Sequence, residues 1–199
     1  MTGRNHTTNG TTASTRRRAR LTVVSAACAG GWPAHVRVRA ARADDAARVR
    51  AMHERCSPET RRLRYFTSAP RLPEDALARL LMPRDGITLV AVAPDGAIGA
   101  MATLFHPAHE DAGEIAVLVE DAWQRHGLGT ELLRALVDEA AERGLRELRA
   151  HVLPWNRRML GLFDRAGLVA RRGYTDGLVL VEAEVPASLA VSRAVNRCA

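Results

Sequence analysis

One strand–turn–helix unit constrains the fold of this chain more than any other stretch of its sequence. The segment Gly113–Val119 is almost continuously apolar, and two glycines, Gly127 and Gly129, precede an amphipathic helix that Gly144 ends. The apolar residues of this helix form two adjacent columns at i, i+4 spacing: Leu128, Leu132, Leu136 and Ala140, and Leu133, Val137 and Ala141. An apolar strand beside such a helix predicts that the strand is buried on both faces of a sheet.

Further elements are predicted before this unit. Alternating apolar and basic residues predict a strand over residues 35–42, and Asp44 or Asp45 can cap the helix that follows. A second helix is expected to start after Ser57, which is a good N-cap, with Pro58 at its first position. A proline followed by acidic residues predicts a third, shorter helix within residues 73–82.

Two hairpins and a second strand–helix unit complete the predicted order. A turn at Pro94–Gly96 joins the strands of the first hairpin. After the glycine-bounded helix, a strand is expected over residues 147–154 and a helix from Asn156 that stops at Gly167. A closing hairpin turns within residues 174–177. The order is therefore β, α, α, α, β, β, β, α, β, α, β, β.

Length and charge favour one domain with two tails. We expect a disordered, arginine-rich leader over residues 1–33, a domain over residues 34–186 and a C-terminal tail over residues 187–199. All 29 basic residues of the chain are arginine, and the net charge is +7. Five of these arginines lie within residues 1–20, and without them the net charge falls to +2. We therefore expect no nucleic-acid partner beyond weak contacts of the leader.

The cysteines and the apolar runs favour a cytoplasmic protein. Cys28, Cys56 and Cys198 are far apart and show neither a disulfide framework nor metal-ligand spacing. No apolar run approaches the roughly 20 residues of a membrane helix. The leader resembles a signal peptide, but Thr22 and Ser25 interrupt its short apolar stretch. We expect no membrane contact and no metal.

The two glycines of the central turn predict an anion site. A helix N-terminus presents unpaired N–H groups and about half a positive charge. Without Cβ atoms, Gly127 and Gly129 allow a phosphate to reach these groups. A dinucleotide fingerprint would need a third small residue where Leu132 stands, and the phosphate loop of NTPases would need a lysine. A tight turn without a ligand is the simpler alternative.

The segment VEDAWQRHGLGTELL, residues 119–133, resembles the acetyl-CoA signature Gln/Arg-x-x-Gly-x-Gly/Ala of the GNAT acetyltransferase superfamily. The resemblance covers about residues 34–186 and includes the order of the elements. Within the superfamily, SPETRRLRYF together with PWNRRML is similar to the catalytic domain of bacterial protein-lysine acetyltransferases. The resemblance implies an α/β (α+β) fold with a mixed, mostly antiparallel central sheet flanked by helices.

The resemblance also implies acetyl-CoA as co-substrate and a set of residues that bind it. The turn that follows Gln124 would hold the pyrophosphate through the backbone amides of Arg125, His126, Gly127, Leu128, Gly129 and Thr130. The strand would pair its backbone with the pantetheine arm at Val117, Leu118 and Val119. Asn156 would hold the cofactor near this arm, and it is also a good N-cap for the helix that it opens.

Acetyl transfer to an amine needs a base, because a free lysine has a pKa near 10.4. Glu114 begins the apolar strand, where partial burial of a carboxylate would raise its pKa toward a useful value. It also matches a glutamate of the lysine-acetylating relatives. His151 is the rival, because an imidazole titrates near neutrality. We expect Glu114 to be the base and His151 its partner or alternative; an exposed acid at the strand end is the alternative for Glu114.

The candidate general acid, two tryptophans and three arginines say less about the reaction. Where many relatives place a tyrosine as general acid, this chain has Phe163, and Tyr174 is a weak substitute. Trp123 and Trp155 are expected beside the cofactor. Three arginines of the second helix form a solvated face or meet an acidic substrate, namely Arg61, Arg62 and Arg64.

The predicted function is an acetyl-CoA-dependent N-acetyltransferase that acts on a protein lysine. The alternatives are acetylation of a small amine, such as a polyamine or an antibiotic, and a non-catalytic acyl-CoA-binding module.

Overall fold

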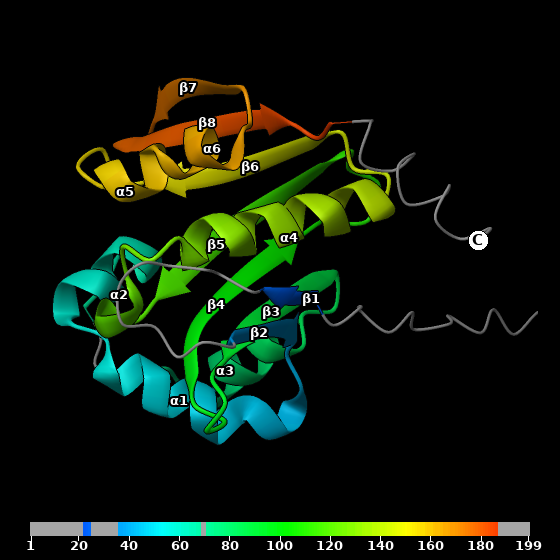
Figure 1. The fold of residues 1–199 in the computed structure, drawn as a ribbon. Coiled ribbons are helices and arrows are strands. Elements are labelled where there is room, and N and C mark those ends of the chain that lie inside the picture. Colours follow the sequence, from blue (N-terminus) through cyan, green and yellow to red (C-terminus); the bar gives the residue numbers. More distant parts are fainter. Residues whose placement is uncertain (1–21, 25–35, 69–70, 187–199) are drawn as a thin grey trace, which may run out of the picture.

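The computed structural model describes residues 22–24, 36–68 and 71–186, which form an eight-stranded sheet with helices on both faces (Figure 1). The spatial order of the strands is β1-β2-β3-β4-β5-β6-β8-β7. Neighbouring strands are antiparallel except β5 and β6, which are parallel. This arrangement confirms the predicted mixed, mostly antiparallel sheet.

The strands are β1 (Thr22–Val24), β2 (Val36–Ala40), β3 (Gly86–Val92), β4 (Ile98–Phe105), β5 (Ala112–Val119), β6 (Glu147–Val152), β7 (Ala170–Thr175) and β8 (Leu178–Glu184). The α-helices are α1 (Ala46–Arg55), α2 (Pro58–Tyr65), α3 (Glu74–Leu81), α4 (Leu128–Glu142), α5 (Arg157–Leu160) and α6 (Leu162–Ala166). Two short 3₁₀ helices are η1 (Ala43–Asp45) and η2 (Asp121–Trp123).

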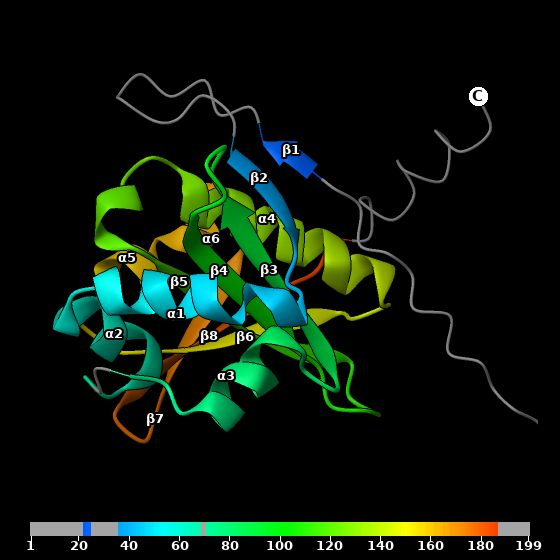
Figure 2. The same cartoon turned by 90° about the horizontal axis from the view of Figure 1, so that it is seen from below.

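The sheet separates two apolar cores. Helices α4 and α6 cover one face, whereas α1 and α3 cover the other, as Figures 1 and 2 show. Strand β5 contributes Ile115 to the first core and Leu118 to the second, so the predicted burial of this strand on both faces is confirmed. The predicted columns of α4 are also confirmed, because their residues are buried in the first core except Ala141, which is partly buried.

Strands β5 and β6 pair over a short distance and then separate. Residues Ala112–Glu114 pair with Glu147–Arg149, and the register of this pair ends there. Strand β5 continues beside β4 up to Val119, while β6 continues beside β8 up to Val152. A gap therefore opens in the sheet directly before the turn that leads into α4.

Three details differ from the prediction. The helix expected from Asn156 to Gly167 is divided into α5 and α6 at Gly161. Strand β1 pairs with β2 although its residues fall within the range predicted to be a disordered leader. The rest of that leader and the tail 187–199 lie outside the described residues, so these boundaries remain predictions.

Asp45 is the N-cap residue of α1, one of the two predicted, but its carboxylate accepts no hydrogen bond from an N–H group of that helix. Its oxygens accept hydrogen bonds from Arg39 at 2.6 and 2.8 Å, from Arg48 at 2.6 Å and from the Arg42 amide at 2.8 Å. Burial alone raises the pKa of this carboxyl, but these hydrogen bonds outweigh burial and hold the pKa below its ordinary value. The fully buried carboxylate thus ties β2 to the start of α1.

We predict that Asp45→Asn lowers the free energy of unfolding by about 3 kcal/mol, because it leaves the buried end of Arg39 without its counterion. Chemical denaturation at pH 7 measures this loss, and Asp44→Asn on the exposed neighbour is the control. Since the folded-state pKa of Asp45 is depressed, its stabilisation is present above the unfolded pKa near 3.9 and is lost as the pH falls through the folded value. Equal stability of the two variants would contradict the role of Asp45.

Candidate functional site

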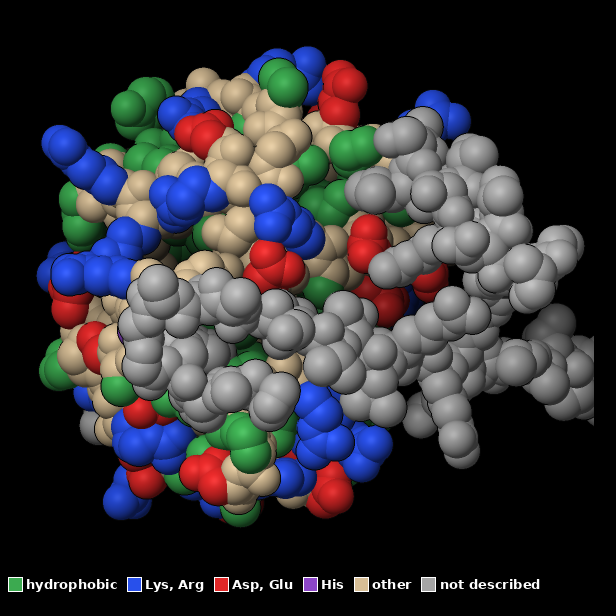
Figure 3. Space-filling view, in the orientation of Figure 1, with side chains coloured by type: hydrophobic (Ala, Val, Ile, Leu, Met, Phe, Trp, Pro, Cys, Tyr) green, Lys and Arg blue, Asp and Glu red, His purple; other side chains and the backbone are tan. Residues whose placement is uncertain are grey.

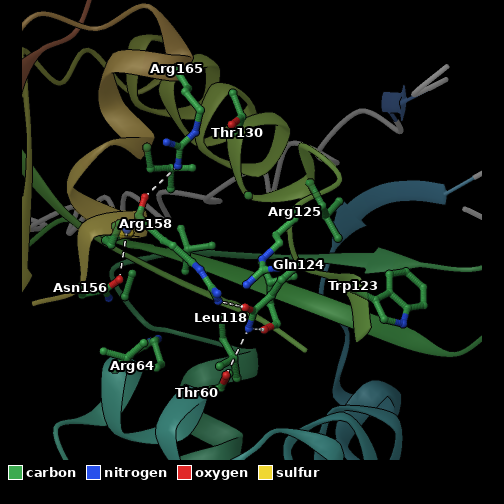
Figure 4. A pocket seen from close by; sticks show the side chains of 18 of the residues that line it. Thr60, Arg64, Leu118, Trp123, Gln124, Arg125, Thr130, Asn156, Arg158 and Arg165 are labelled. Carbon is green, nitrogen blue, oxygen red and sulfur yellow. Dashed lines mark hydrogen bonds between the residues drawn. The ribbon is translucent and has the colours of Figure 1, made fainter. Parts of the chain in front are cut away.

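A cavity of about 460 Å³ lies where β5 and β6 separate. It is lined by β5, by the turn between β5 and α4, by the start of α4, by α5 and α6, and by α2 (Figure 4). Every residue predicted to bind the cofactor lines this cavity except His126. The cavity also includes His151, whereas Glu114 lies beside it.

The turn before α4 has the geometry of an anion cradle. Gly127 is the N-cap of α4 with φ +85°, a conformation that favours glycine. Gly129 has a different role, because a Cβ there would meet Leu162 at 3.4 Å, which is an ordinary contact. Its lack of a side chain therefore serves the cavity rather than the packing. The N–H groups of this first helical turn lack partners within the helix and suit a phosphate.

Gln124 joins three walls of the cavity. Its Nε2 donates hydrogen bonds to the Val119 carbonyl at 3.0 Å and to Thr60 Oγ1 at 3.1 Å, and its Oε1 accepts one from Arg158 (Figure 4). The side chain therefore links β5 to α2 and α5. One backbone group predicted to pair with pantetheine, the Val119 carbonyl, is thus already engaged.

The sequence predicts two roles for Asn156, the N-cap of a helix and a contact with the cofactor. Its Oδ1 accepts a hydrogen bond from the Met159 amide at 3.1 Å, as an N-cap does. The same residue lines the cavity, and its side-chain NH₂ group takes no part in this N-cap hydrogen bond. The N-cap prediction is confirmed, and the contact with the cofactor remains a prediction.

Glu114 and His151 meet where the two strands separate. Glu114 Oε1 lies 3.3 Å from His151 Nδ1. Glu114 occupies the last paired position of β5, and His151 lies two residues beyond the last paired position of β6. The side chain of Glu114 is 56% exposed and that of His151 is 37% exposed. The expectation that Glu114 is partly buried is therefore wrong. Its contact with the imidazole of His151 is what separates it from an ordinary exposed acid at a strand end.

The cavity is strongly basic. Four arginines line it, and none of the described residues that line it is acidic. Three of these arginines, Arg125, Arg158 and Arg165, lie around the turn and α5–α6, and Arg165 Nη2 donates to the Arg158 carbonyl at 2.8 Å. Figure 3 shows arginine side chains gathered at the edge of the molecule between α2 and α5. Arg158 lies on α5 and Arg165 lies on α6. In this segment the sequence pattern points to Asn156 alone, and the spacing of the two arginines gives no sign that they line the cavity.

Two aromatic predictions have different outcomes. Trp123 lines the cavity, and its ring occupies the place that a Cβ on Gly99 would take, at 1.9 Å from a ring atom. Trp155, in contrast, is 54% exposed, does not line the cavity and lies under the Arg62 guanidinium at 5.6 Å. The expectation that Trp155 packs beside the cofactor is therefore wrong.

The candidate general acids and the three arginines of α2 also differ in burial and in whether they line the cavity. Phe163 is fully buried, and Tyr174 is 83% exposed on β7 and lies outside the cavity. Arg61 is buried and donates to the Cys56 carbonyl, which rules out a solvated role. Arg62 is exposed, and Arg64 lines the cavity. Among the described residues, no cluster could hold a metal ion and no helix is long and apolar enough to cross a membrane.

The comparisons with known proteins agree with this geometry. The model of the "Acetyltransferase (GNAT) family" matches residues 47–168. Acetyltransferase PA5475 of Pseudomonas aeruginosa is 31% identical over 153 residues, which are 74% of this chain and 82% of the relative. The chain therefore belongs to the GNAT acetyltransferase family. It is an acetyl-CoA-dependent N-acyltransferase.

Solved structures extend the comparison. The GNAT domain of S. lividans PAT has a TM-score of 0.73 and 31% identity, covering 83% of this chain and 96% of that domain. Spermidine N-acetyltransferase from Vibrio cholerae, in complex with CoA and spermine, has a TM-score of 0.60 and covers 78% of this chain and 98% of that one. At 14% identity the second likeness shows the fold alone. Acetyl-CoA, as the co-substrate of the family, fits the bare turn at Gly129 and the arginines around it.

We predict that acetyl-CoA raises the melting temperature of the protein and that Gly129→Glu removes this shift, because a carboxylate would occupy the phosphate position. A ligand at a hundred times its Kd stabilises a fold by about 2.7 kcal/mol, which thermal denaturation resolves. Gly129→Ala is the matched control, since its Cβ meets only ordinary contacts and should retain most of the shift. An undiminished shift in Gly129→Glu would mean that the glycine serves the turn alone.

Proposed function

We propose that this chain transfers the acetyl group of acetyl-CoA to the side-chain amine of a protein lysine, with Glu114 as the general base. The observation that carries the proposal is the 3.3 Å contact between Glu114 Oε1 and His151 Nδ1 beside the cavity. A carboxylate and an imidazole are the groups that most often move protons near neutral pH. Both lie where the strands begin to separate, and the anion cradle lies at the other end of β5.

The residues of the site divide the work of the reaction. The α4 turn and its arginines bind the phosphate groups, which leaves the acetyl end to extend along β5 toward Glu114. The Glu114 carboxylate takes a proton from the ammonium of the acceptor, and the neutral nitrogen then attacks the acetyl carbon. The carbon–sulfur bond breaks, CoA leaves as its thiolate, and the second proton lost by the nitrogen converts this thiolate to the thiol. His151 orients this carboxylate through their hydrogen bond and is the alternative acceptor of the proton.

A protein lysine is supported as acceptor by the sequence of α2 and α5. The segments SPETRRLRYF and PWNRRML are similar to those of bacterial protein-lysine acetyltransferases, and they contain α2 and α5, which both contribute to the lining of the cavity. The 31% identity to the GNAT domain of S. lividans PAT supports the same branch. A small amine is the second candidate, because the fold is also that of a spermidine N-acetyltransferase.

We expect Glu114→Gln to retain the thermal shift with acetyl-CoA but to lose about 10²- to 10⁴-fold in kcat at pH 7, the range typical of general base catalysis. The residual rate should rise with pH, since more of the amine is then deprotonated in solution. Thiol release from acetyl-CoA, measured against a panel of lysine peptides and small amines, gives kcat and its dependence on pH.

His151→Gln, measured in parallel, separates the two bases. A large defect in His151→Gln beside a nearly normal Glu114→Gln would reassign the base to His151. Normal rates in both variants would show that the protein selects the free amine and would overturn the proposed role of Glu114. Failure of the wild type to acetylate any amine of the panel would overturn the proposed acceptor.

A further inference from the structure

One arginine of the cavity, Arg64, lies at the α2 end and apart from the turn that forms the anion cradle. Arg64 lies on α2 and lines the cavity together with Thr60 from the same helix. In Figure 4 both lie on the α2 side of Leu118, whereas Arg125, Arg158 and Arg165 lie on the opposite side. Arg64 is thus separated from the group of arginines that surrounds the anion cradle. Glu114 is one of the groups that oppose the lowering of the Arg64 pKa, so Arg64 lies toward the Glu114 end of the cavity.

The guanidinium of Arg64 lacks an anionic partner within the described part of the chain. Its Nε is buried without a hydrogen-bond partner, and no ion pair joins it to any described residue. Its guanidinium carbon lies 4.8 Å from the centroid of the neighbouring Tyr65 ring. Burial lowers the pKa of Arg64, and the nearby Tyr65 and Glu114 only partly oppose this effect. The residue as a whole is half-buried, and a partly desolvated positive charge is stabilised when an anion pairs with it.

Glu114 does not fill this role. Its Oε1 is engaged with His151, and its distance from Arg64 exceeds that of an ion pair. Arg64 lines the cavity and Glu114 lies beside it, and no ion pair joins these two opposite charges among the described residues. An acceptor that carries both an ammonium group and a carboxylate would satisfy both of them, the ammonium at Glu114 and the carboxylate at Arg64.

On the basis of the proposed function, we propose that Arg64 binds a carboxylate that the acceptor carries beside its reacting amine. The acceptor class is thus an acid-bearing amine. In a protein this means a lysine with an aspartate or glutamate next to it, and among small molecules it means an amino acid. A polyamine lacks the carboxylate and would bring further positive charge to Arg64, so it is disfavoured.

Matched acceptor pairs test the proposal. Lysine and cadaverine differ by one carboxylate, as do two peptides with a Lys-Asp or a Lys-Asn sequence. We expect the wild type to prefer the acid-bearing member of a pair by about ten- to a hundredfold in kcat/KM, the effect of a charge-assisted hydrogen bond. The peptide pair and the small-molecule pair distinguish the two sources of the carboxylate. Thiol release measures each rate.

Variants of Arg64 connect this preference to the side chain. Arg64→Gln should abolish the preference mainly through a higher KM for the acid-bearing acceptor, and Arg64→Glu should reverse it in favour of cadaverine. Arg64→Lys should retain part of it, because the charge remains but the forked geometry is lost. The control is Arg62→Gln, on the exposed arginine over Trp155, which should leave the preference unchanged. The thermal shift with acetyl-CoA should persist in all four variants and shows that they fold.

The outcomes separate this proposal from the proposed function. Acetylation of both members of each pair at equal rates, or a preference that survives Arg64→Gln, would overturn the role of Arg64 and leave the acetyltransferase in place. Acetylation of acid-free amines alone would also overturn it. Absence of acetylation with every amine would instead overturn the proposed acceptor class as a whole.

Discussion

Strands β5 and β6 pair over three positions and then diverge, and the functional part of the structure depends on this divergence. The outer edges of both strands remain bonded to β4 and β8, so the sheet stays intact while a gap opens inside it. Backbone groups of β5 beyond Glu114 have no strand partner on the β6 side within the described chain. Such groups need partners, and a bound chain with amide groups can supply them. The cavity, the α4 cradle and the Glu114–His151 pair all lie along this gap.

Packing on both faces keeps the gap open. Leu132, Leu133 and Leu136 of α4 anchor the helix on one side of the sheet, so its N-terminal turn is held at the end of β5. On the other side α2 is tied to β5 through Gln124, which also bonds to α5, while Trp123 packs against the core on the α4 side and on the bare backbone of Gly99. These contacts fix the walls before any ligand binds. A preformed site of this kind loses less ordering free energy when a ligand enters.

Local patterns in the sequence predicted those features that local forces determine. The i, i+4 columns of α4 and the N-cap at Ser57 depend on neighbouring residues, and both are as expected. The predictions that failed depend on distant contacts. The carboxylate of Asp45 joins Arg39 of β2 instead of capping α1, and Trp155 lies under Arg62 of α2 instead of beside the cavity. The position of Arg158 and Arg165 at the cavity likewise follows from how α5 and α6 pack, which no spacing in the sequence indicates.

The charges along the gap explain how one cavity can serve two substrates of different kinds. At the α4 end, Arg125, Arg158 and Arg165 surround a helix N-terminus, and the field there favours phosphate groups. At the α2 end, Glu114 lies near enough to Arg64 to oppose the lowering of its pKa, so charges of both signs are present there. A phosphate bound at that end would be repelled by the Glu114 carboxylate, and an ammonium bound at the α4 end would be repelled by the three arginines. Each end therefore disfavours the substrate of the other, and the acetyl-CoA and the amine enter a single cavity in one orientation.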